Sequence, residues 1–409
     1  QIRIGTIESL FGTGYGQLVI LKTITFILLG VIGAMHRKKL LATLETFAKK
    51  FWQLVSVEFV IFGIAIGLGT ALARTENPVS EVPGGQLTPA EILTGAKLPP
   101  EPTMWTWATT FKPDILWILI TAALAGFYLV GVWRLKQRGD SWSWARTASW
   151  LAGVGLLAYV TNGYFSAYEQ YLFSAHMLAH MLLAMGVPVL LVPGAPVTLL
   201  ARAVSKRQDD SRGVREWILW AIHTKYAQFI SHPLVAATMF ASSLVIFYFT
   251  PIFGWATREH IGHQWMIVHF VITGYLFVQA IIGIDPGPSR FGYPQRLMLL
   301  IGTLAFHAFF GLAVMNSTTL LLADWFGAMG RTWGEDPLTD QQTGGGIAWG
   351  LGELPTAAIT LIVAIQWARS DERDAKRLDR ASDRGGNEDL AEYNRMLDAL
   401  SKRKQEPRN

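Results

Sequence analysis

The chain has 409 residues, 51% of them hydrophobic and 16% charged, and its mean hydropathy is +0.30. This composition excludes an ordinary soluble protein, because a single hydrophobic core stops growing at about 250–300 residues and cannot bury so much apolar surface. Cysteine is absent, which excludes disulfides, zinc fingers and thiolate metal sites, so any metal must be held by His, Met or carboxylate. The net charge of +5 is concentrated in certain connections and does not indicate nucleic-acid binding.

Long apolar segments recur along the chain, and a bilayer crossing takes about 20 residues of helix. Each crossing must satisfy its own backbone hydrogen bonds in the hydrocarbon, which favours helices. We therefore predict an all-α integral membrane protein with about nine transmembrane helices. The expected spans are 16–35, 52–73, 113–134, 147–165, 176–199, 234–252, 264–284, 297–320 and 347–368.

Lys and Arg gather in alternate connections between these spans. The basic stretches are 37–50, 134–146, 202–225, 290–296 and the tail after 369. In contrast, 74–112 contains several Glu residues, and 166–175 contains no Lys or Arg. Because basic connections stay in the cytoplasm, we predict a multi-pass plasma-membrane protein whose N-terminal end is extracytoplasmic and whose tail is cytoplasmic.

The predicted spans fall into two groups. Residues 1–73 form a helical hairpin, 74–112 an extracytoplasmic linker, 113–370 a seven-helix bundle, and 371–409 a charged cytoplasmic tail. The chain begins at Gln1 without Met or a signal-peptide pattern, so we expect it to be part of a longer polypeptide. No strand precedes Gly344 to Gly346, so these glycines do not indicate a dinucleotide site.

Six of the nine histidines lie in the membrane or at its predicted outer face, whereas His36, His223 and His232 lie at cytoplasmic ends. His176 and His180 are four residues apart, which places both on one helix face about 6 Å from each other. Two imidazoles at that spacing can share a metal ion, and the alternative is hydrogen-bonded packing between helices.

A second group of candidate ligands is spaced by threes at the start of the seventh span: His260, His263, Met266 and His269. The series drifts around the helix, so only neighbouring members can share a site. His and Met together suit the soft ion Cu(I). Taken singly, each methionine is more simply explained as core filling.

Two ionisable residues lie deeper, His307 in the eighth span and Glu353 in the ninth. Such groups are costly in a membrane and usually face the bundle interior. We expect each to be either a ligand or proton partner, or a structural hydrogen-bonding group. The connection 321–346 carries Asp324, Glu335, Asp336 and Asp340, which would attract a cation to the outer mouth.

Several stretches resemble the CtaG-type cytochrome c oxidase assembly factors, in the form found in actinobacteria. They are FSAHMLAHMLLAMGVPVLLVPGAPVTLLAR (173–202), HPLVAATMF (232–240), IGIDPGPSRFGYPQR (282–296), FHAFFGLAVMNSTTLL (306–321), DPLTDQQTGGGIAWGLGELPT (336–356) and QWARSDERDAKRLDR (366–380). GYGQLVILKTITFILLGVIGAMHRKKL (14–40) resembles the last hairpin of a CopD-type copper-resistance protein. The two families are known as fusions.

The resemblance implies a non-enzymatic factor that helps to place copper in the catalytic subunit of cytochrome c oxidase. It maps the family histidines onto His176, His180, His260, His263, His269 and His307. It maps the acidic and glutamine-containing outer segment onto Asp324, Asp340, Gln341, Gln342 and Glu353.

On this basis we hypothesise that Cu(I) from extracytoplasmic donors is held transiently by His176, His180, His263 and His269, with Met266 as a further soft ligand. It would then pass to a docked oxidase subunit within the lipid bilayer. Three alternatives remain open at this point: a copper transporter or resistance permease, a haem-binding membrane cytochrome, and a metal-free assembly scaffold.

Overall fold

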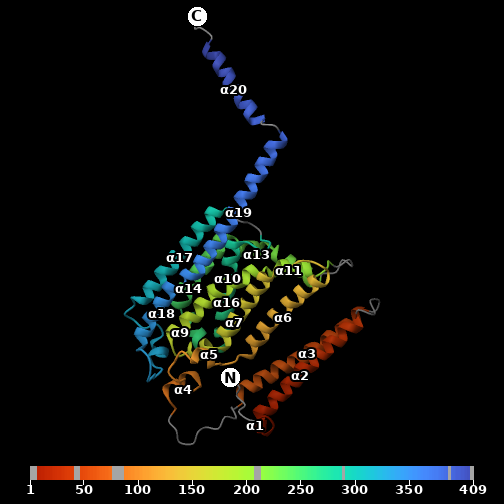
Figure 1. The fold of residues 1–409 in the computed structure, drawn as a ribbon. Coiled ribbons are helices and arrows are strands. Elements are labelled where there is room, and N and C mark those ends of the chain that lie inside the picture. The colour runs from red at the N-terminus through yellow and green to blue at the C-terminus, as the bar shows by residue number, and fades with distance from the viewer. Residues whose placement is uncertain are drawn as a thin grey trace. The chain divides into compact units, whose positions relative to one another are not determined.

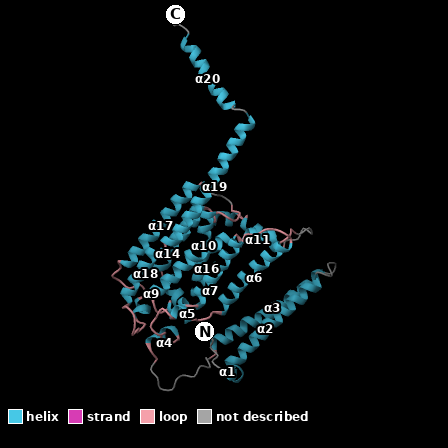
Figure 2. Cartoon of the chain, viewed as in Figure 1, coloured by secondary structure: helices cyan, strands magenta, loops and turns pink. Residues whose placement is uncertain are grey.

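A computed structural model describes residues 7–40, 47–75, 87–206, 213–287, 291–385 and 388–405. Every regular element in these ranges is helical, which confirms the predicted all-α class (Figures 1 and 2). The chain divides into two compact units, Gln1–Gln86 and Leu87–Asn409. The predicted linker is divided between them, because residues 87–112 belong to the second unit.

The described residues of the first unit form three helices: α1 (Ile7–Gly12), α2 (Gly14–Leu40) and α3 (Phe47–Arg74). The long helices α2 and α3 lie side by side (Figure 1). Tyr15, Thr25, Ile61 and Ala65 are buried within this unit. His36 lies in α2, but its side chain is outside the described residues.

Most helices of the second unit pack around one core, whereas the described side chains of α20 are exposed. Its first half consists of α4 (Pro89–Thr94), α5 (Thr106–Thr109), α6 (Ile115–Gln137), α7 (Trp144–Asn162), α8 (Tyr164–Tyr168), α9 (Phe173–Met181), the π-helical turn η1 (Leu182–Gly186), α10 (Val187–Leu191), the 3₁₀ turn η2 (Val192–Gly194) and α11 (Pro196–Ala203). Its second half consists of α12 (Val214–Ile222), α13 (Lys225–Ile230), α14 (Pro233–Tyr248), α15 (Pro251–Arg258), α16 (His260–Ile282), α17 (Tyr293–Met315), the π-helical turn η3 (Ala323–Gly327), α18 (Pro337–Leu351), α19 (Glu353–Gly385) and α20 (Glu388–Gln405).

Nine membrane crossings are expected from the sequence, and the described residues contain fewer helices with the length and hydropathy of a span. Among the described residues, six helices are long and apolar enough to cross a membrane, or seven if the bent pair α14 and α15 is one span. That pair is bent by 77° at the break before Pro251, which donates no backbone hydrogen bond. The expected span 52–73 corresponds to a shorter apolar stretch, Ser56–Leu72, and 147–165 to α7, which is absent from the six.

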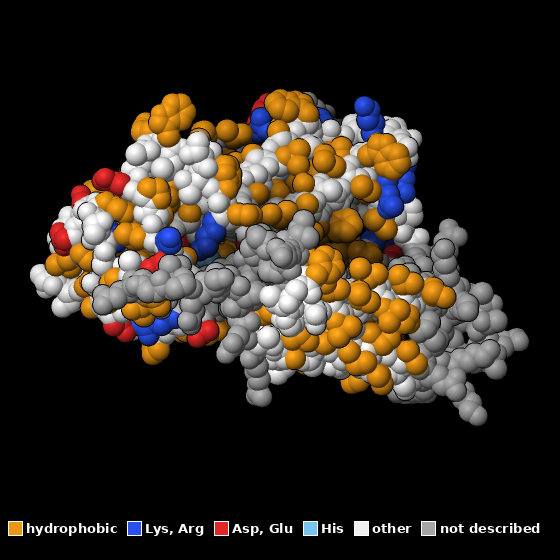
Figure 3. Space-filling model, turned by 90° about the horizontal axis from the view of Figure 1, so that it is seen from below, with side chains coloured by type: hydrophobic (Ala, Val, Ile, Leu, Met, Phe, Trp, Pro, Cys, Tyr) orange, Lys and Arg blue, Asp and Glu red, His pale blue; other side chains and the backbone are white. Residues whose placement is uncertain are grey.

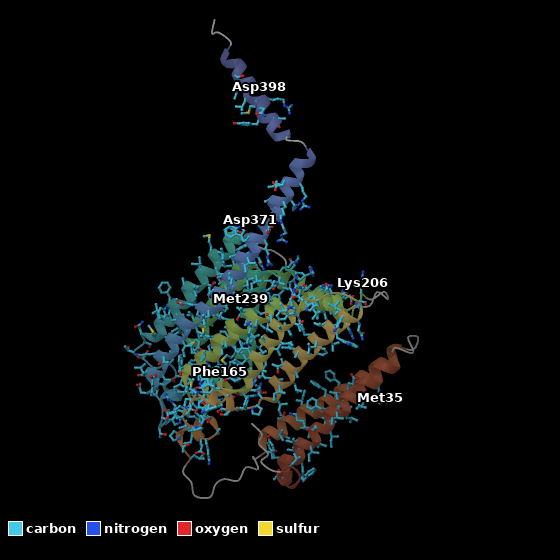
Figure 4. All side chains as sticks on the ribbon, viewed as in Figure 1. Met35, Phe165, Lys206, Met239, Asp371 and Asp398 are labelled. Carbon is cyan, nitrogen blue, oxygen red and sulfur yellow. The ribbon has the colours of Figure 1, made fainter. Side chains whose placement is uncertain are left out.

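The connections of the second unit meet at two ends of the bundle. At one end, Arg138 donates to the Ser205 hydroxyl at 3.0 Å, which joins two predicted cytoplasmic stretches. At the other, Lys112 donates to the Gln170 side chain at 3.2 Å, which joins two predicted outer stretches. Figure 4 shows Phe165 and Asp371 toward opposite ends. The grouping agrees with the predicted alternation, and which end is cytoplasmic stays a prediction.

Hydrophobic side chains cover much of the face shown in Figure 3. Large apolar residues are exposed on the long helices, for example Phe127 on α6 at 79% and Phe309 on α17 at 72%. Water would oppose so much exposed apolar surface, and lipid does not. The surface is therefore that of a membrane protein.

The π-helical turn η1, which we call the wide turn, interrupts the helix that carries His176 and His180. η1 follows α9 directly, and Pro188 in α10 has no backbone N–H to give to Ala184 four residues earlier. Gly274 of α16 approaches the Ala184 carbonyl so closely that a Cβ at this position would lie 1.9 Å from the oxygen. A residue without a side chain is therefore required where α16 crosses the wide turn.

Candidate functional site

The site begins with the buried pair His176 and His180 on α9, whose side chains are 2% and 1% exposed. α9 starts at Phe173, where the backbone N–H donates to the Asp340 carboxylate at 2.7 Å, and the Ser174 hydroxyl bonds to the same carboxylate. These bonds hold the beginning of α9 against α18. The four-residue spacing then directs both imidazoles into the bundle.

Aromatic rings enclose the two imidazoles. The ring centres of His176 and His180 are 5.9 Å apart, and their planes are nearly perpendicular. Phe253 lies against His176 with ring centres 5.3 Å apart, and Phe270 lies against His180 with ring centres 3.3 Å apart. The Tyr248 hydroxyl is 2.6 Å from His180 Nδ1, which leaves Nε2 of His180 as the nitrogen for another partner.

Three buried imidazole nitrogens have no hydrogen-bond partner in the described part of the chain: His176 Nε2, His180 Nε2 and His307 Nδ1. Buried polar atoms are nearly always satisfied, so each exception needs an explanation. A neutral imidazole nitrogen that is not protonated carries a lone pair and is a good metal ligand. The atoms are therefore candidates for binding a soft cation.

A buried ion pair lies at the predicted outer end of this cluster. Glu169, which is 5% exposed, contacts His263 Nε2 through its carboxylate at 3.1 Å. Burial alone would raise the pKa of Glu169, but His263, His176 and Lys112 together hold it below its ordinary value. Burial lowers the pKa of Lys112, and Glu169 opposes this shift. The carboxylate therefore stays charged, in contact with His263.

His307 lies deeper and contacts a methionine. Its Nε2 is 3.0 Å from Met181 Sδ, and its ring stacks on Phe240 with ring centres 5.9 Å apart. A Cβ on Gly352 would lie 3.6 Å from His307 Cδ2 and 3.8 Å from Met185 Sδ, so a second thioether is near. His307 is 2% exposed, which confirms that it faces the bundle interior.

The other predicted ligands have separate surroundings. His269 stacks on Trp265 with ring centres 4.8 Å apart. His260 is the first residue of α16 and is exposed, while Met266 is 1% exposed and belongs to the core. No metal role was expected for His223 and His232. His223 is exposed, and His232 is the N-cap residue of α14.

The polar residues of the outer segment have protein partners. Asp324 forms an ion pair with Arg258. Gln341 accepts from the Leu321 N–H at 2.6 Å and donates to the Thr319 carbonyl, and Gln342 donates to the Ser317 carbonyl at 3.2 Å. These bonds close the connection between α17 and α18, whereas the Asp340 bonds hold α18 against the start of α9.

The expectation for Glu353 was wrong in one respect. The sequence suggested a side chain facing the bundle interior, but Glu353 is exposed. The physical reason is the helix face: α19 packs against α16 and α17, its buried residues are Thr356, Ile359 and Val363, and Glu353 lies outside that face.

The predicted four-histidine set does not form one preassembled centre. Among the described residues, no three His, Asp or Glu side chains are close enough to hold one metal ion. The structure instead brings together small groups: Glu169 with His263, His176 with His180, and His307 with Met181. Such groups allow low-coordinate binding, which Cu(I) tolerates and which a hard or tetrahedral ion does not favour.

Three residues that contribute to the site were not among the candidate ligands predicted from the sequence. Tyr248 has no neighbouring ligand-type residue in the sequence, and only its position at the end of α14 brings it to His180. Met181 is one residue beyond His180 and was interpreted as core filling. Glu169 could have been found, because it is the only charged residue in 163–172.

Comparisons with known proteins bear on both units. Residues 126–370 match the family described as cytochrome c oxidase caa3 assembly factor, and residues 1–72 match copper resistance protein D. The chain is similar to uncharacterized proteins of Mycobacterium bovis and Mycobacterium tuberculosis, with 41% identity over 314 residues, which is 76% of this chain and 48% of each relative. A protein of Mycobacterium leprae is 40% identical over 320 residues, 78% of this chain and 48% of its own. The chain thus spans about half the length of these relatives, and no solved structure matches it.

Proposed function

The chain belongs to the family of cytochrome c oxidase caa3 assembly factors, and from this premise we propose that it carries copper for the oxidase. In this proposal the chain is not an enzyme. It receives Cu(I) at the predicted outer face, holds it transiently and helps to deliver it to the haem-copper centre of the catalytic subunit.

The observation that carries the proposal is the set of three unpartnered nitrogens on His176, His180 and His307. All three side chains are at most 2% exposed, so water does not readily replace the missing partners. A cation that accepts two ligands would satisfy a pair of them at once. Copper bound as cargo would therefore give these buried nitrogens a partner, which a purely structural role does not supply.

The surroundings support Cu(I) over other metal ions. Thioether sulfur selects Cu(I), and Met177 Sδ lies 3.5 Å from the Tyr248 hydroxyl that also contacts His180. Met181 similarly accompanies His307. The aromatic enclosure keeps water away from the ion, which protects the lower oxidation state.

The arrangement of the candidate ligands in small groups also supports release of copper. A closed cage of four ligands would hold copper too tightly to be transferred, whereas two-ligand groups permit exchange with an incoming ligand. Glu169 and His263 lie at the predicted entrance, where their ion pair is close enough to His176 for Glu169 to interact electrostatically with that imidazole. We propose that copper enters here and that the oxidase subunit docks at this end.

Titration with Cu(I) under anaerobic, reducing conditions tests the proposal, with a competing chromophoric chelator as the readout. The double variant His176→Ala, His180→Ala is expected to lose bound copper. The matched control is His223→Ala, His232→Ala, which removes two histidines at the opposite end. Unchanged stoichiometry in the first variant, with both variants folded, would overturn the site and leave a metal-free scaffold.

One observation favours a second candidate, copper transport across the membrane. The contact between His307 and Met181 continues the line of possible ligands below His180, with Met185 close by. Copper uptake into vesicles containing the purified chain distinguishes the two roles, because an assembly factor releases copper only to a protein acceptor. Haem has weaker support, since Phe253 and Phe270 pack directly on the imidazoles, and a Soret band in the purified protein would be needed to revive it.

A further inference from the structure

A second site lies at the other end of the bundle, where α19 leaves it. A cavity of about 500 Å³ opens between the end of α16, the start of α17 and one face of α19. This volume is in the range of sites that bind small molecules. None of the candidate copper ligands lines it.

The cavity is strongly basic. Arg369, Arg373 and Lys376 line it from α19, at spacings of four and three residues that place them on one helix face. Arg296 of α17 is the fourth cation, and Glu372 is the single acid in the lining. The lining therefore carries a net charge of +3.

Part of this charge has no protein counterion. Lys376 forms an ion pair with Glu372, but in the described ranges no carboxylate pairs with Arg369 or Arg373. Arg296 donates to the carbonyls of Phe291 and Ile281, which fixes its guanidinium at the cavity wall. The N-terminus of the 23-residue helix α17 lies at the same place and adds a positive potential. The site is thus arranged for an anion.

The position of the cavity indicates which anion. α16 ends at Ile282 and α17 begins at Tyr293, and both helices are long and apolar enough to cross the membrane. On α19, Ile365 is an exposed apolar residue, whereas most exposed residues from Arg369 to Arg380 are charged, the exceptions being Ala375 and Leu378. Tyr293 stacks on Trp367 between these regions, with ring centres 6.3 Å apart. Paired aromatic residues of this kind mark the level of the lipid headgroups.

We propose that this cavity binds the phosphodiester headgroup of an anionic phospholipid. Arg373 donates its Nε–H to the Arg369 carbonyl at 3.0 Å. The other guanidinium N–H groups of Arg373 and those of Arg369 suit phosphate oxygens, which arginine binds through paired hydrogen bonds. Basic pockets between membrane helices bind such headgroups by the same chemistry. The proposal does not depend on the copper site, which lies toward the opposite end of the bundle.

The test uses the purified full chain in phosphatidylcholine nanodiscs that contain increasing amounts of phosphatidylglycerol. Phosphatidylglycerol retained by the protein is counted by native mass spectrometry after release. The triple variant Arg369→Gln, Arg373→Gln, Lys376→Gln is expected to weaken retention by about a hundredfold, since each cation near an anionic membrane surface contributes about a factor of five.

The matched control is Lys136→Gln, Lys225→Gln, Arg380→Gln, which removes the same charge from exposed positions outside the cavity. It is expected to retain phosphatidylglycerol as the unmodified chain does. Equal loss in both variants would overturn the site, because surface charge alone would then explain retention. Displacement of the lipid by inorganic phosphate would also overturn it, in favour of a soluble anion. If the triple variant does not fold, the exposed single variant Arg373→Glu replaces it, and unchanged retention there refutes the proposal.

Discussion

Replacing Gly274 with alanine tests whether the close crossing of α16 over the wide turn holds the histidine cluster together. The new Cβ would lie 1.9 Å from the Ala184 oxygen and 2.9 Å from Pro188 Cγ, whereas ordinary contacts begin at 3.4 Å. Backbone must therefore move by about 1.5 Å, because the obstructing atom is a carbonyl oxygen and not a flexible side chain.

Overpacking of this kind costs about 1–3 kcal/mol, which corresponds to a fall in the thermal midpoint of about 1–5 °C for a domain of this size. The movement also separates α9 from α16, so Cu(I) affinity should fall in the same variant. The control is Gly302→Ala on α17, where a Cβ meets no atom within 4 Å. The control should be neutral or stabilising by up to about 1 kcal/mol.

The assay is thermal unfolding in detergent, followed by tryptophan fluorescence, with the Cu(I) titration run on the same samples. If Gly274→Ala and Gly302→Ala unfold at the same temperature, the crossing is not as close as described. If Gly274→Ala is destabilised but binds copper normally, the crossing supports the fold alone and does not set the spacing of the ligands.

Three further predictions concern contacts around the cluster. Met181→Leu conserves volume and should cost less than about 1.5 kcal/mol, but it removes the sulfur beside His307 and should weaken Cu(I) binding by at least about tenfold, as measured by chelator competition. The variant Glu169→Gln should lose a pH dependence of stability that the unmodified chain shows in acid. Because the pKa of Glu169 is lowered in the folded chain, its carboxylate stabilises the fold above the ordinary pKa of 4.5. This contribution disappears as the pH falls through the pKa of the folded state. Thermal midpoints on either side of pH 4.5 measure the difference, and parallel curves would contradict it. Asp340→Ala leaves the Phe173 N–H without its partner and should cost about 1–3 kcal/mol, which the unfolding assay detects.

Much of the fold follows from patterns that sequence alone displays. Apolar length predicts the helices, and the distribution of Lys and Arg predicts which connections meet, as the contact between Arg138 and Ser205 illustrates. The break in 234–252 was harder to predict, because apolar residues continue across it to Phe253 and only Pro251 marks the bend. The wide turn after Met181 was also not predicted, since it depends on how Gly274 of another helix approaches it.

The candidate site, like the fold, could be predicted from the sequence only in part. The spacing of His176 and His180 predicts a pair on one face, because helical geometry is local. The partners of that pair come from α14, α15 and α16, and no local rule connects Tyr248 or Phe253 to them. His263 was grouped with the pair because it lies at a similar depth, but depth does not fix direction, and its strongest contact is with Glu169.

The wide turn η1 has a consequence for how variants of this chain should be compared. It places one extra residue between the histidines above and Pro188 below, and one residue corresponds to about 100° of rotation in an α-helix. A deletion within Leu182–Gly186 that restored a regular turn would rotate His176 and His180 away from Tyr248 and leave the segment equally apolar. The number of residues between His180 and Pro188 is therefore as much a determinant of the site as the two imidazoles themselves.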